Sequence, residues 1–378
     1  MIKPSPATGI VSCTTELMNI GPTLPEVQNL EVDLGQFAPL HQGRSVLITG
    51  AGGSIGSCLF QAILCHHPKV LVGLDSSESS LHDLCTSVAP QRPVTVLGSV
   101  CDAPLLEELF RSHRPEIVYH AAAFKHVAIA ENNPFEVTRN NVLGTHCVAQ
   151  AAMRHGTEQV LTISTDKAVD PTSILGAGKR IAELLMLAFT SSQPLMKAVR
   201  LANIWGSRGS VVPLFLRQIS AGGPLTVTDP AVQRYFMSMS SALAVIFTAA
   251  AEKDGGIFVP ELENQIPVLK VAQSLIQHTG LAEDAIPIVF TGLQPGEKME
   301  ELLVSKQEIR YAINDILAGL ASPTVSPQEI IGLMEALGDA LQRRSLPDLL
   351  NIVLTLVPEY RPSDSLTNRE VCCGRARR

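Results

Sequence analysis

The sequence predicts an α/β fold in which a doubly wound parallel sheet is joined to a smaller C-terminal lobe. From residue 45 onwards, short runs rich in β-branched residues alternate with segments of helical length, as in consecutive strand–helix–strand units. A glycine-rich turn at 49–56 directly follows the first of these runs. After about residue 205 the alternation gives way to glycine- and proline-rich loops between shorter elements, which indicates a second structural unit.

Each element is predicted from its own pattern. The strands of the main sheet are predicted, in chain order, at 45–50, 70–75, 94–98, 117–123, 160–165 and 198–204. A helix around and after Lys179 is predicted because its apolar residues share one face at helical spacing; they are Ile181, Leu184, Leu185, Ala188 and Phe189. Two later runs, 257–262 and 287–293, are predicted to be isolated strands.

These elements suggest five segments. We expect a loosely held N-terminal arm at 1–40, the sheet domain at 41–205, a lobe at 206–306 that interleaves with it, a mainly helical segment at 307–360, and a disordered tail at 361–378.

Composition narrows the class of protein. The 378 residues carry a formal net charge of −7, which argues against nucleic acid as the main partner. No apolar run reaches the roughly 18 residues of a membrane span, so we expect no membrane insertion. The eight cysteines show neither CxxC pairs nor zinc-like spacing. We therefore expect a cytoplasmic protein with reduced thiols and no metal site.

The turn TGAGGSIG, residues 49–56, carries a cofactor signal. Its glycines Gly50, Gly53 and Gly56 allow a tight turn, a close approach of the backbone to a pyrophosphate, and packing of the next helix on the sheet. Asp75 ends the second predicted strand, where its carboxylate can bind an adenosine ribose and would repel a 2′-phosphate. The pattern predicts a Rossmann-type domain that binds NAD, with NADP left possible. A glycine-rich surface turn would not explain Asp75.

The lysine at position 179 raises a question about the reaction. In short-chain dehydrogenases a tyrosine four residues before such a lysine removes the proton of the substrate hydroxyl. This sequence has Leu175 at that position. Simple alcohol oxidation by the usual route is therefore not expected.

The adjacent pair Asp166 and Lys167 suggests a different chemistry. Once a sugar carbon has been oxidised to a ketone, a neutral lysine can remove the neighbouring proton and an aspartic acid can protonate a leaving hydroxyl. Adjacent strand residues point to opposite faces, so both reach one substrate only if the chain leaves strand geometry near Thr165. Pro171 makes such a turn plausible. The alternative is a solvated Asp-Lys pair in a loop.

Several segments together resemble one family. The sequence is similar to the nucleotide-sugar 4,6-dehydratases of the extended short-chain dehydrogenase/reductase family, in the polysaccharide-biosynthesis branch that acts on UDP-N-acetylglucosamine. The resemblance rests on TGAGGSIG, AAAFKHVAIAENNPFEVTRNNVLGT, STDKAVDPTSILGAGKRIAE, WGSRGSVVPLF, QRYFMS and TGLQPGEKMEELL, in that order, and LVPEYRPS near the end also fits.

The resemblance implies roles for individual residues. The catalytic residues would be Thr165, Asp166, Lys167 and Lys179, with Asp166 as the acid toward the C6 hydroxyl, Lys167 as the base at C5, and Lys179 on the nicotinamide ribose. The cofactor residues would be Gly50, Gly53, Ser54, Ile55, Gly56, Asp75, Ser99, Val100, Ala121, Ala122 and Lys179. The residues that bind the UDP-sugar would be Lys125, His126, Asn203, Arg208, Arg234 and Glu297. The family also implies a homo-oligomer.

Three positions depart from the family pattern. Leu175 stands where related proteins have methionine or tyrosine, which leaves open what deprotonates the 4-hydroxyl. Ser99 replaces an aspartate that contacts the adenine, and Gln294 replaces an arginine at the expected diphosphate site. Two alternatives therefore remain: a UDP-sugar 4-epimerase, and a non-catalytic protein that binds NAD or a nucleotide sugar on a decayed scaffold. The epimerase would not need the Asp-Lys pair.

Overall fold

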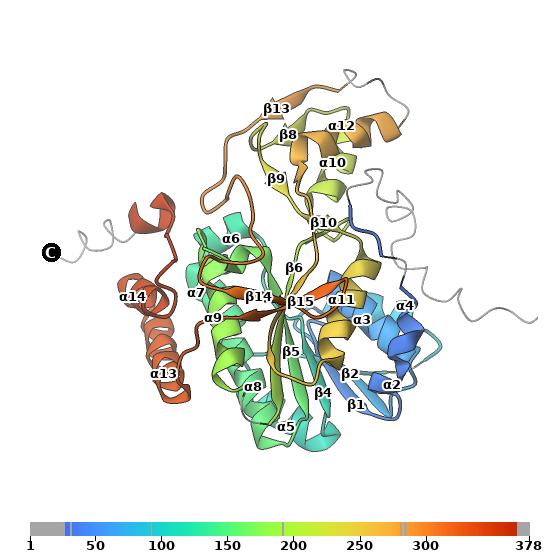
Figure 1. Ribbon diagram of the computed structural model, residues 1–378, viewed down its shortest axis with the longest axis vertical. Coiled ribbons are helices and arrows are strands. Elements are labelled where there is room, and N and C mark those ends of the chain that lie inside the picture. Colours follow the sequence, from blue (N-terminus) through green and yellow to red (C-terminus); the bar gives the residue numbers. More distant parts are fainter. Residues whose placement is uncertain are drawn as a thin grey trace, which may run out of the picture.

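The computed structural model describes residues 27–30, 32–91, 93–190, 193–279, 282 and 286–368. A large sheet with helices on both faces forms the body of the molecule, and a smaller lobe lies above the upper end of the sheet in Figure 1. No helix in the described ranges is both long enough and apolar enough to cross a membrane.

The main sheet has nine strands in the order β14-β15-β11-β6-β5-β4-β1-β2-β3. Its members are β1 Ser45–Thr49, β2 Val70–Asp75, β3 Val94–Leu97, β4 Ile117–His120, β5 Gln159–Thr165, β6 Leu195–Leu201, β11 Gly256–Pro260, β14 Ile309–Ala312 and β15 Leu317–Ala321. Strands β1 to β6 and β11 pair in parallel. The predicted α/β class and all six predicted strands are confirmed.

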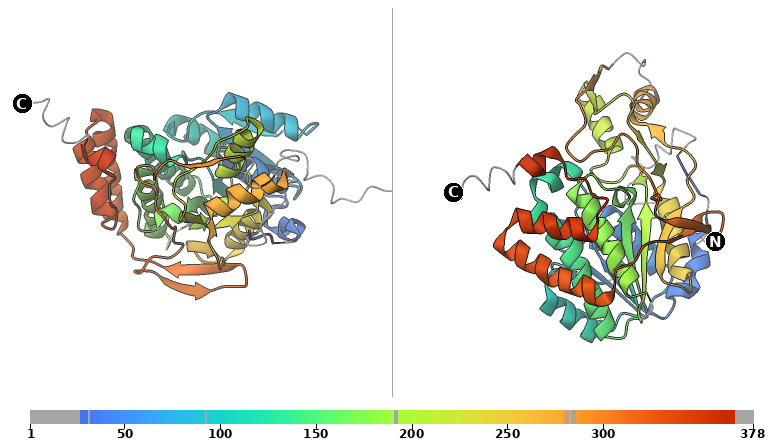
Figure 2. Two further views of the ribbon diagram at one scale, coloured as in Figure 1. Left: turned by 90° about the horizontal axis from the view of Figure 1, so that it is seen from above. Right: turned by 60° about the vertical axis from the view of Figure 1, so that its left-hand side comes forward.

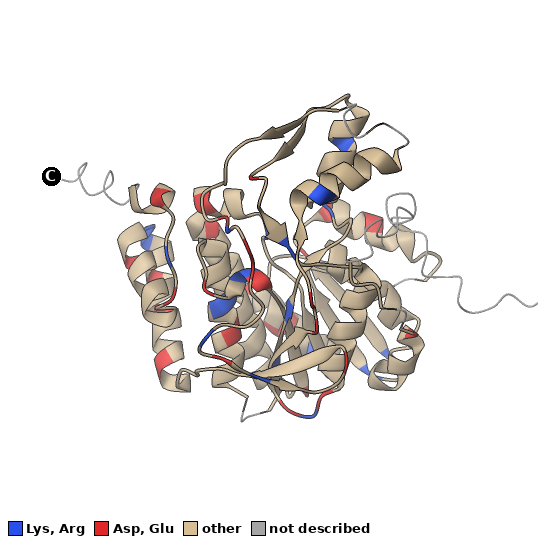
Figure 3. Ribbon diagram, turned by 45° about the horizontal axis from the view of Figure 1, so that its top comes forward, with Lys and Arg blue, Asp and Glu red and all other residues tan. Residues whose placement is uncertain are grey.

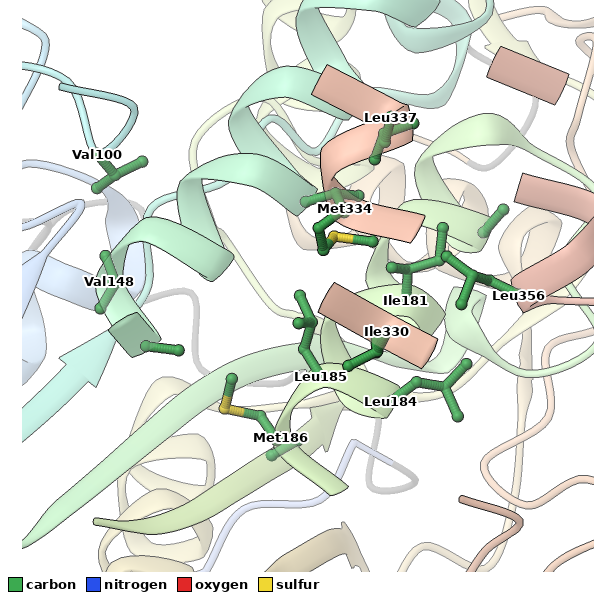
Figure 4. Packing of buried hydrophobic residues seen from close by; sticks show 14 of the residues in the cluster. Val100, Val148, Ile181, Leu184, Leu185, Met186, Ile330, Met334, Leu337 and Leu356 are labelled. Atoms are coloured by element: carbon green, nitrogen blue, oxygen red, sulfur yellow. The ribbon is translucent and has the colours of Figure 1, made fainter. Parts of the chain in front are cut away.

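Helices cover the two faces of the sheet with separate apolar clusters. On one face lie α3 Ser54–Leu64, α4 Glu78–Ser87 and α11 Met239–Ala251. On the other lie α5 Ala103–His113, α8 Gly144–Arg154 and α9 Ile174–Ala188, with α13 Pro327–Arg343 and α14 Leu346–Leu356 packed outside α9 (Figure 2). Figure 4 shows Ile181 and Leu184 of α9 beside Ile330 and Met334 of α13. Helix α9 is thus buried between the sheet and a second helical layer.

The strand order reverses between β1 and β4. The chain passes outward from β1 to β3, then crosses back to β4 and continues outward in the other direction. Open parallel sheets bind ligands in the crevice at the carboxyl ends of the strands where this reversal occurs. Here that crevice lies between the turn after Thr49 and the segment after His120.

The lobe has a hydrophobic cluster of its own. It is built from α10 Val211–Ser220, β8 Leu225–Val227, α12 Val268–His278 and β13 Ile288–Phe290, with β8 and β13 paired in parallel. The run at 287–293 therefore forms a paired strand, not an isolated one. The run at 257–262 is also not isolated, because β11 joins the main sheet beside β6. Isolated strands were wrong for both runs.

The segment predicted as mainly helical begins with a hairpin. Strands β14 and β15 pair antiparallel and extend the sheet beyond β11, and only then do α13 and α14 follow. The prediction was wrong for this part because edge strands such as β14, which is exposed along its length, carry little apolar pattern.

Both ends of the described chain are held more firmly than the sequence suggested. Residues 1–26 of the expected arm and 369–378 of the expected tail lie outside the described residues. Within the structure Val27 is buried, and the backbone of Gln28 pairs with Phe236 and Ser238. At the other end Leu366 is fully buried and the Arg361 amide donates to the Pro171 carbonyl. A loose arm and a disordered tail are wrong for these stretches.

The remaining elements are short and mostly lie near the carboxyl ends of the strands. They are η2 Leu34–Phe37, α2 Ala38–His41, α6 Val127–Asn132, α7 Pro134–Thr138, η3 Arg139–Leu143, η4 Asp166–Ala168, β7 Asn203–Ile204, β9 Gln233–Arg234, β10 Phe236–Met237 and β12 Ile266–Pro267.

A chain of neutral side chains fastens α2 to the sheet. His41 Nε2 lies 2.7 Å from the Tyr119 hydroxyl, His41 Nδ1 lies 2.8 Å from His66 Nδ1, and His66 Nε2 lies 3.0 Å from the Leu34 carbonyl. All three hydrogen bonds can form with both imidazoles neutral. The Tyr119 hydroxyl then donates to His41 Nε2, His41 Nδ1 donates to His66 Nδ1, and His66 Nε2 donates to the Leu34 carbonyl. Burial, followed by the repulsion that a protonated His66 would exert, lowers the pKa of His41 to about 3.

We expect the free energy of unfolding to fall as the pH drops below about 6.5. Burial, and then the charge of Lys179, lowers the pKa of His120 to about 3 as well. Between about pH 6.5 and 3 the unfolded chain binds protons at His41 and His120 that the folded protein does not bind. Each residue contributes up to about 1.4 kcal/mol per pH unit in this window, which urea unfolding across the range measures.

In the variant His41→Gln, the free energy of unfolding should depend less steeply on pH between about pH 6.5 and 3, because the contribution of His41 is lost. His82, exposed on α4, provides the matched control as His82→Gln and should leave the slope unchanged. An unaltered slope in His41→Gln would contradict the neutral chain described above.

Candidate active site

The predicted departure from strand geometry occurs at the end of β5. Thr165 is the last strand residue, and a single 3₁₀ turn, η4, begins at Asp166. The Thr165 hydroxyl accepts a 3.5 Å hydrogen bond from the Lys167 amide and so caps the turn. The turn brings the two side chains together, with Lys167 Nζ 2.8 Å from Asp166 Oδ1. The chain therefore leaves strand geometry at Thr165, which is the condition that the sequence analysis set for both side chains to reach one substrate.

Asp166 is fully buried and only half of its carboxylate is occupied. Oδ1 accepts hydrogen bonds from Lys167 and, at 2.9 Å, from the Thr165 hydroxyl. Oδ2 is buried and has no hydrogen-bond partner among the described residues. A buried carboxylate oxygen without a donor is costly. This oxygen therefore lacks one hydrogen-bond donor in the arrangement that the structure describes.

Lys167 is surrounded by acceptors. Its amino group lies 3.4 Å from the Asn203 amide oxygen and 3.6 Å from the Glu301 carboxylate. Burial acts to lower the pKa of Lys167, but the charges of Asp166 and Glu301 outweigh burial and raise it. The chemistry inferred from the sequence needs a neutral amine. In this arrangement the ammonium form is favoured instead.

Basic and acidic residues are mixed over the described part of the chain in Figure 3. Four of them are buried together beside β5: Arg180, Glu183, Arg200 and Glu308. Arg200 pairs with Glu183 and with Glu308, with closest contacts of 2.8 and 2.7 Å. Arg180 contacts the same two carboxylates at 3.0 and 3.3 Å. Burial would raise the pKa of Glu308, but the hydrogen bonds and charge of Arg200 lower it to about 2. All four groups are thus charged and mutually compensated.

This cluster is joined directly to η4, the predicted catalytic turn. The Ser164 hydroxyl donates a 2.6 Å hydrogen bond to Glu183, and Ser164 is the residue before Thr165. Arg200 also donates 2.7 Å to the carbonyl of Leu303, in the segment that carries Glu301. The cluster therefore fixes the end of β5 relative to that segment.

Helix α9 presents Lys179 but keeps Leu175 out of the site. Leu175 is 2 % exposed and belongs to the apolar cluster. Lys179 is buried and donates 2.8 Å to the Ile163 carbonyl of β5. Burial lowers its pKa to about 8, although Glu183 acts in the opposite direction. Lys179 thus lies under the strand that ends at Thr165, and its contact with a nicotinamide ribose stays a prediction.

A glycine that the sequence analysis missed allows α9 to approach the turn. A Cβ on Gly176 would lie 2.2 Å from the Lys167 carbonyl oxygen, which is far inside van der Waals contact. Glycine is an unfavourable residue within a helix. The two glycines in Leu-Gly-Ala-Gly-Lys were therefore the available signal in the sequence that another part of the chain approaches the helix closely.

The glycine turn has the geometry of a dinucleotide site. Gly50 has a φ of +69°, and a Cβ there would lie 2.6 Å from the Ala122 amide nitrogen. Gly53 is the N-cap of α3, which begins at Ser54 and continues through Ile55. A Cβ on Gly56 would lie 2.0 Å from the Gly50 carbonyl oxygen. The turn, the α3 N-terminus and the segment after β4 therefore meet at the reversal point of the sheet.

The other predicted cofactor residues surround this turn or follow a neighbouring strand. Asp75 ends β2 and accepts 2.9 Å hydrogen bonds from the amides of Gly52 and Ser77. The Ala121 amide pairs with the Thr49 carbonyl, which places Ala121 and Ala122 against the turn. Ser99 and Val100 follow β3; the Ser99 hydroxyl accepts from Cys101, and Val100 is buried. An NAD molecule fits this donor set.

The predicted substrate residues divide into two groups. The first group lies near η4 and contains Asn203, Lys125 and Arg208. Asn203 contacts Lys167. Partial burial, together with the charges of Arg208 and Lys167, lowers the pKa of Lys125. His126 packs against Gly209, whose Cβ would lie 2.7 Å from the imidazole. Arg208 contacts the glycine turn, through its amide to the Ser54 hydroxyl and its guanidinium to the Gly52 carbonyl.

Arg234 and Glu297 form the second group and bind each other. The guanidinium of Arg234 donates to Glu297 at 3.1 Å and to the carbonyls of Gln233, Lys298 and Met299. Glu297 also accepts from the Thr228 hydroxyl and the Gln294 amide. Their polar atoms are engaged within the protein, so in this arrangement they hold the segment around residue 297 in place.

In the part of the chain that the structure describes, no group of three or more metal-ligating side chains is placed to hold a metal ion.

Replacing Gly56 with alanine should disrupt the predicted cofactor site. The new Cβ would overlap the Gly50 carbonyl oxygen, and overpacking of this kind costs about 1–3 kcal/mol. We expect the Kd for NAD, measured by isothermal titration calorimetry, to rise roughly tenfold or more. Gly338→Ala on α13, where a Cβ meets no atom within 4 Å, is the control and should leave the Kd unchanged. Equal affinity in both variants would contradict the assignment.

Replacing Arg200 with methionine should destabilise the fold strongly. The change leaves Glu183 and Glu308 buried with one arginine between them, and breaking a buried ion pair costs about 3–5 kcal/mol. Arg343→Met removes an exposed pair with Asp348 and should cost less than about 1 kcal/mol. Urea unfolding measures both free energies, and similar losses in the two variants would refute the importance of the cluster.

Comparison with known proteins identifies the family to which the chain belongs. A family model described as "Polysaccharide biosynthesis protein" matches residues 46–316. "Probable polysaccharide biosynthesis protein EpsC" of Bacillus subtilis is 40% identical over 74% of this chain, which spans 48% of that relative. The chain thus spans about half the length of this relative.

Two further relatives carry different activities in their names. "UDP-N-acetylglucosamine 4,6-dehydratase (inverting)" of Campylobacter jejuni is 29% identical over 80% of this chain and 91% of its own length. "UDP-glucose 4-epimerase" of Rickettsia rickettsii is 31% identical over 71% of this chain and 80% of its own length.

Solved structures share the fold. The X-ray structure of Pen from Bacillus thuringiensis has a TM-score of 0.68 and 28% identity, and covers 78% of this chain and 98% of its own. The Bordetella bronchiseptica enzyme WbmG, solved with NAD and UDP, has a TM-score of 0.56 and 25% identity, over 68% and 84% of the two chains. As the motifs predicted, the chain belongs to the polysaccharide biosynthesis protein family of extended short-chain dehydrogenases.

Proposed function

We propose that the chain is an NAD-dependent nucleotide-sugar 4,6-dehydratase that acts on UDP-N-acetylglucosamine and makes a 4-keto-6-deoxy sugar. The observation that carries the proposal is the ion pair at the end of β5 between the buried Asp166 and the half-buried Lys167, with one carboxylate oxygen left without a donor among the described residues. NAD rather than NADP is part of the proposal because of Asp75, a cytoplasmic location because of the cysteine pattern, and a homo-oligomer because of the family resemblance alone.

The glycine turn, Asp75 and Lys179 would hold the cofactor, which supplies the hydride acceptor at C4 and the hydride donor at C6. The protein then has to move protons. Lys167 takes the proton from C5, and Asp166 gives a proton to the hydroxyl that leaves C6 as water. Both groups must be neutral for this step. That state is the tautomer of the ion pair, reached when one proton moves across the 2.8 Å gap from Lys167 to Asp166.

A proton count assigns a part to Thr165. In the elimination Lys167 gains a proton and Asp166 loses one, and Lys167 later returns its proton to C5. The pair ends one proton short, which equals the proton lost from the 4-hydroxyl. The 4-hydroxyl loses its proton before the elimination, when Asp166 already carries the proton that it will give. The first proton would therefore leave by way of the Thr165 hydroxyl, 2.9 Å from Asp166 Oδ1, to solvent, and one proton would return to the pair from solvent after the elimination. Leu175, buried in the apolar cluster, takes no part.

The nucleotide would lie near two cations at this edge of the sheet. Lys125 and Arg208 are exposed residues, and partial burial followed by the charges of Arg208 and Lys167 lowers the pKa of Lys125, so an anionic diphosphate beside them would be favoured. Asn203 and His126 lie beside them. For Arg234 and Glu297 we propose an indirect part, because their mutual contact holds the segment that carries Glu301.

A 4-epimerase is the second candidate, favoured by the Rickettsia relative whose name carries that activity. An epimerase has no need for an acid and a base beside C5 and C6, so the Asp166–Lys167 pair argues for dehydration. A non-catalytic binding protein is the third candidate, supported by Leu175, Ser99 and Gln294. Incubation with UDP-N-acetylglucosamine separates the three: loss of one water, an isomer of unchanged mass, or no turnover.

Lys167→Ala should abolish dehydration and leave NAD bound. Loss of a general base lowers the rate by about 10²–10⁴-fold, while the glycine turn remains intact. Mass spectrometry of the nucleotide sugar measures turnover, and calorimetry measures NAD binding. Lys306→Ala, at an exposed position, is the matched control. Retention of most of the activity in Lys167→Ala would exclude Lys167 as the base.

A further inference from the structure

A second buried carboxylate, Glu301, faces the amino group of Lys167. Lys167 Nζ lies 2.8 Å from Asp166 Oδ1 and 3.6 Å from Glu301 Oε1, and the Glu301 side chain is 3% exposed. The Lys167 ammonium is thus shared between two acidic groups that come from distant parts of the chain. Neither the spacing of the sequence nor the family motifs assigned a role to Glu301.

Glu301 is itself held on several sides. The side-chain amide of Gln265 pairs with its backbone in both directions, accepting from the amide at 3.2 Å and donating to the carbonyl at 3.0 Å. Lys298 Nζ lies 2.8 Å from the second carboxylate oxygen and donates 2.9 Å to the Val169 carbonyl, just beyond η4. The carboxylate therefore has a fixed place relative to the catalytic turn.

The contacts form a row of alternating charges: Asp166, Lys167, Glu301 and Lys298. We propose that Glu301 is a positioning residue, which holds the Lys167 amino group in the site and keeps the Asp166–Lys167 pair in its ionic form until substrate binds. Its catalytic meaning rests on the proposed function, since it assumes that Lys167 acts as a base.

The charges around Lys167 give the direction of the effect. Asp166 and Glu301 favour the ammonium form, whereas Arg234 opposes it, and Lys125 is close enough to sense the Lys167 charge. Asn203 contributes a neutral amide. Loss of the Glu301 charge therefore makes it easier for the proton to move from Lys167 to Asp166, and Lys167 should titrate at a lower pH.

Competitive acetylation of the full-length protein tests this without any substrate. Trace isotope-labelled acetic anhydride reacts only with neutral amines, so the yield at Lys167, read by peptide mass spectrometry across pH, gives its titration midpoint. In Glu301→Gln we expect the midpoint to fall by about one unit, the size typical of a charge within a few ångströms. Glu300→Gln is the matched control, because Glu300 is the exposed neighbour and contacts Gln233. Its midpoint should stay at the wild-type value.

A second variant covers the case in which Glu301→Gln does not fold. Lys298→Met removes the cation that shares the Glu301 carboxylate, and the Lys167 midpoint should then rise. An unshifted midpoint in Glu301→Gln, an equal shift in Glu300→Gln, or a fall in Lys298→Met would each overturn the proposal.

Turnover provides the second readout. If the wild-type protein dehydrates UDP-N-acetylglucosamine, the alkaline limb of its pH–rate profile, where the Asp166–Lys167 pair loses its one proton, should move to lower pH in Glu301→Gln by the same amount as the acetylation midpoint. A limb that stays in place while the midpoint moves would overturn the catalytic part of the proposal. Absence of turnover in the wild type would refute the proposed function, and the acetylation midpoints would still decide whether Glu301 controls Lys167.

Discussion

The end of strand β5 is the constraint on which the candidate site depends. If the strand continued past Thr165, Asp166 and Lys167 would point to opposite faces of the sheet. The 3₁₀ turn brings them within 2.8 Å of each other instead. Two features hold the turn in place: the close approach of α9 at Gly176, and the hydrogen bond from Ser164 to the buried charge cluster. The acid–base pair is thus a product of the surrounding packing.

The charge cluster also explains how distant segments reach this point. Arg200 on β6 and Glu183 on α9 lie behind the turn, while Glu308 belongs to the segment that leads into the β14–β15 hairpin. Because Arg200 also binds the Leu303 carbonyl, the segment that carries Glu301 is tied to the same cluster. Buried ion pairs contribute little net stability compared with apolar packing, but a broken pair is costly. The cluster therefore penalises any arrangement that separates the turn from Glu301.

Local pattern was enough to predict strands β1 to β6 of the sheet and the glycine turn after β1. The six strands have strong β-branched runs, and the spacing from the glycines to Asp75 reflects contacts within one βαβ unit. Features that depend on distant pairing were missed. Strand β14 is exposed, Leu366 is buried only because it packs on other elements, and Glu301 becomes a neighbour of Lys167 only after the lobe segment returns to the sheet. The contact between Arg234 and Glu297 was hidden for the same reason.

The central claim is that Asp166 and Lys167 remove water across C5 and C6 of a nucleotide sugar. The most direct measurement is the reaction of UDP-N-acetylglucosamine in deuterium oxide, followed by NMR of the product. The account predicts a 4-keto-6-deoxy sugar that has lost one water. This product carries a single solvent deuterium at C5, because Lys167 exchanges its proton with solvent. No deuterium enters C6, because C6 receives the unlabelled hydrogen from C4. A product of unchanged mass, or one without deuterium at C5, would contradict it.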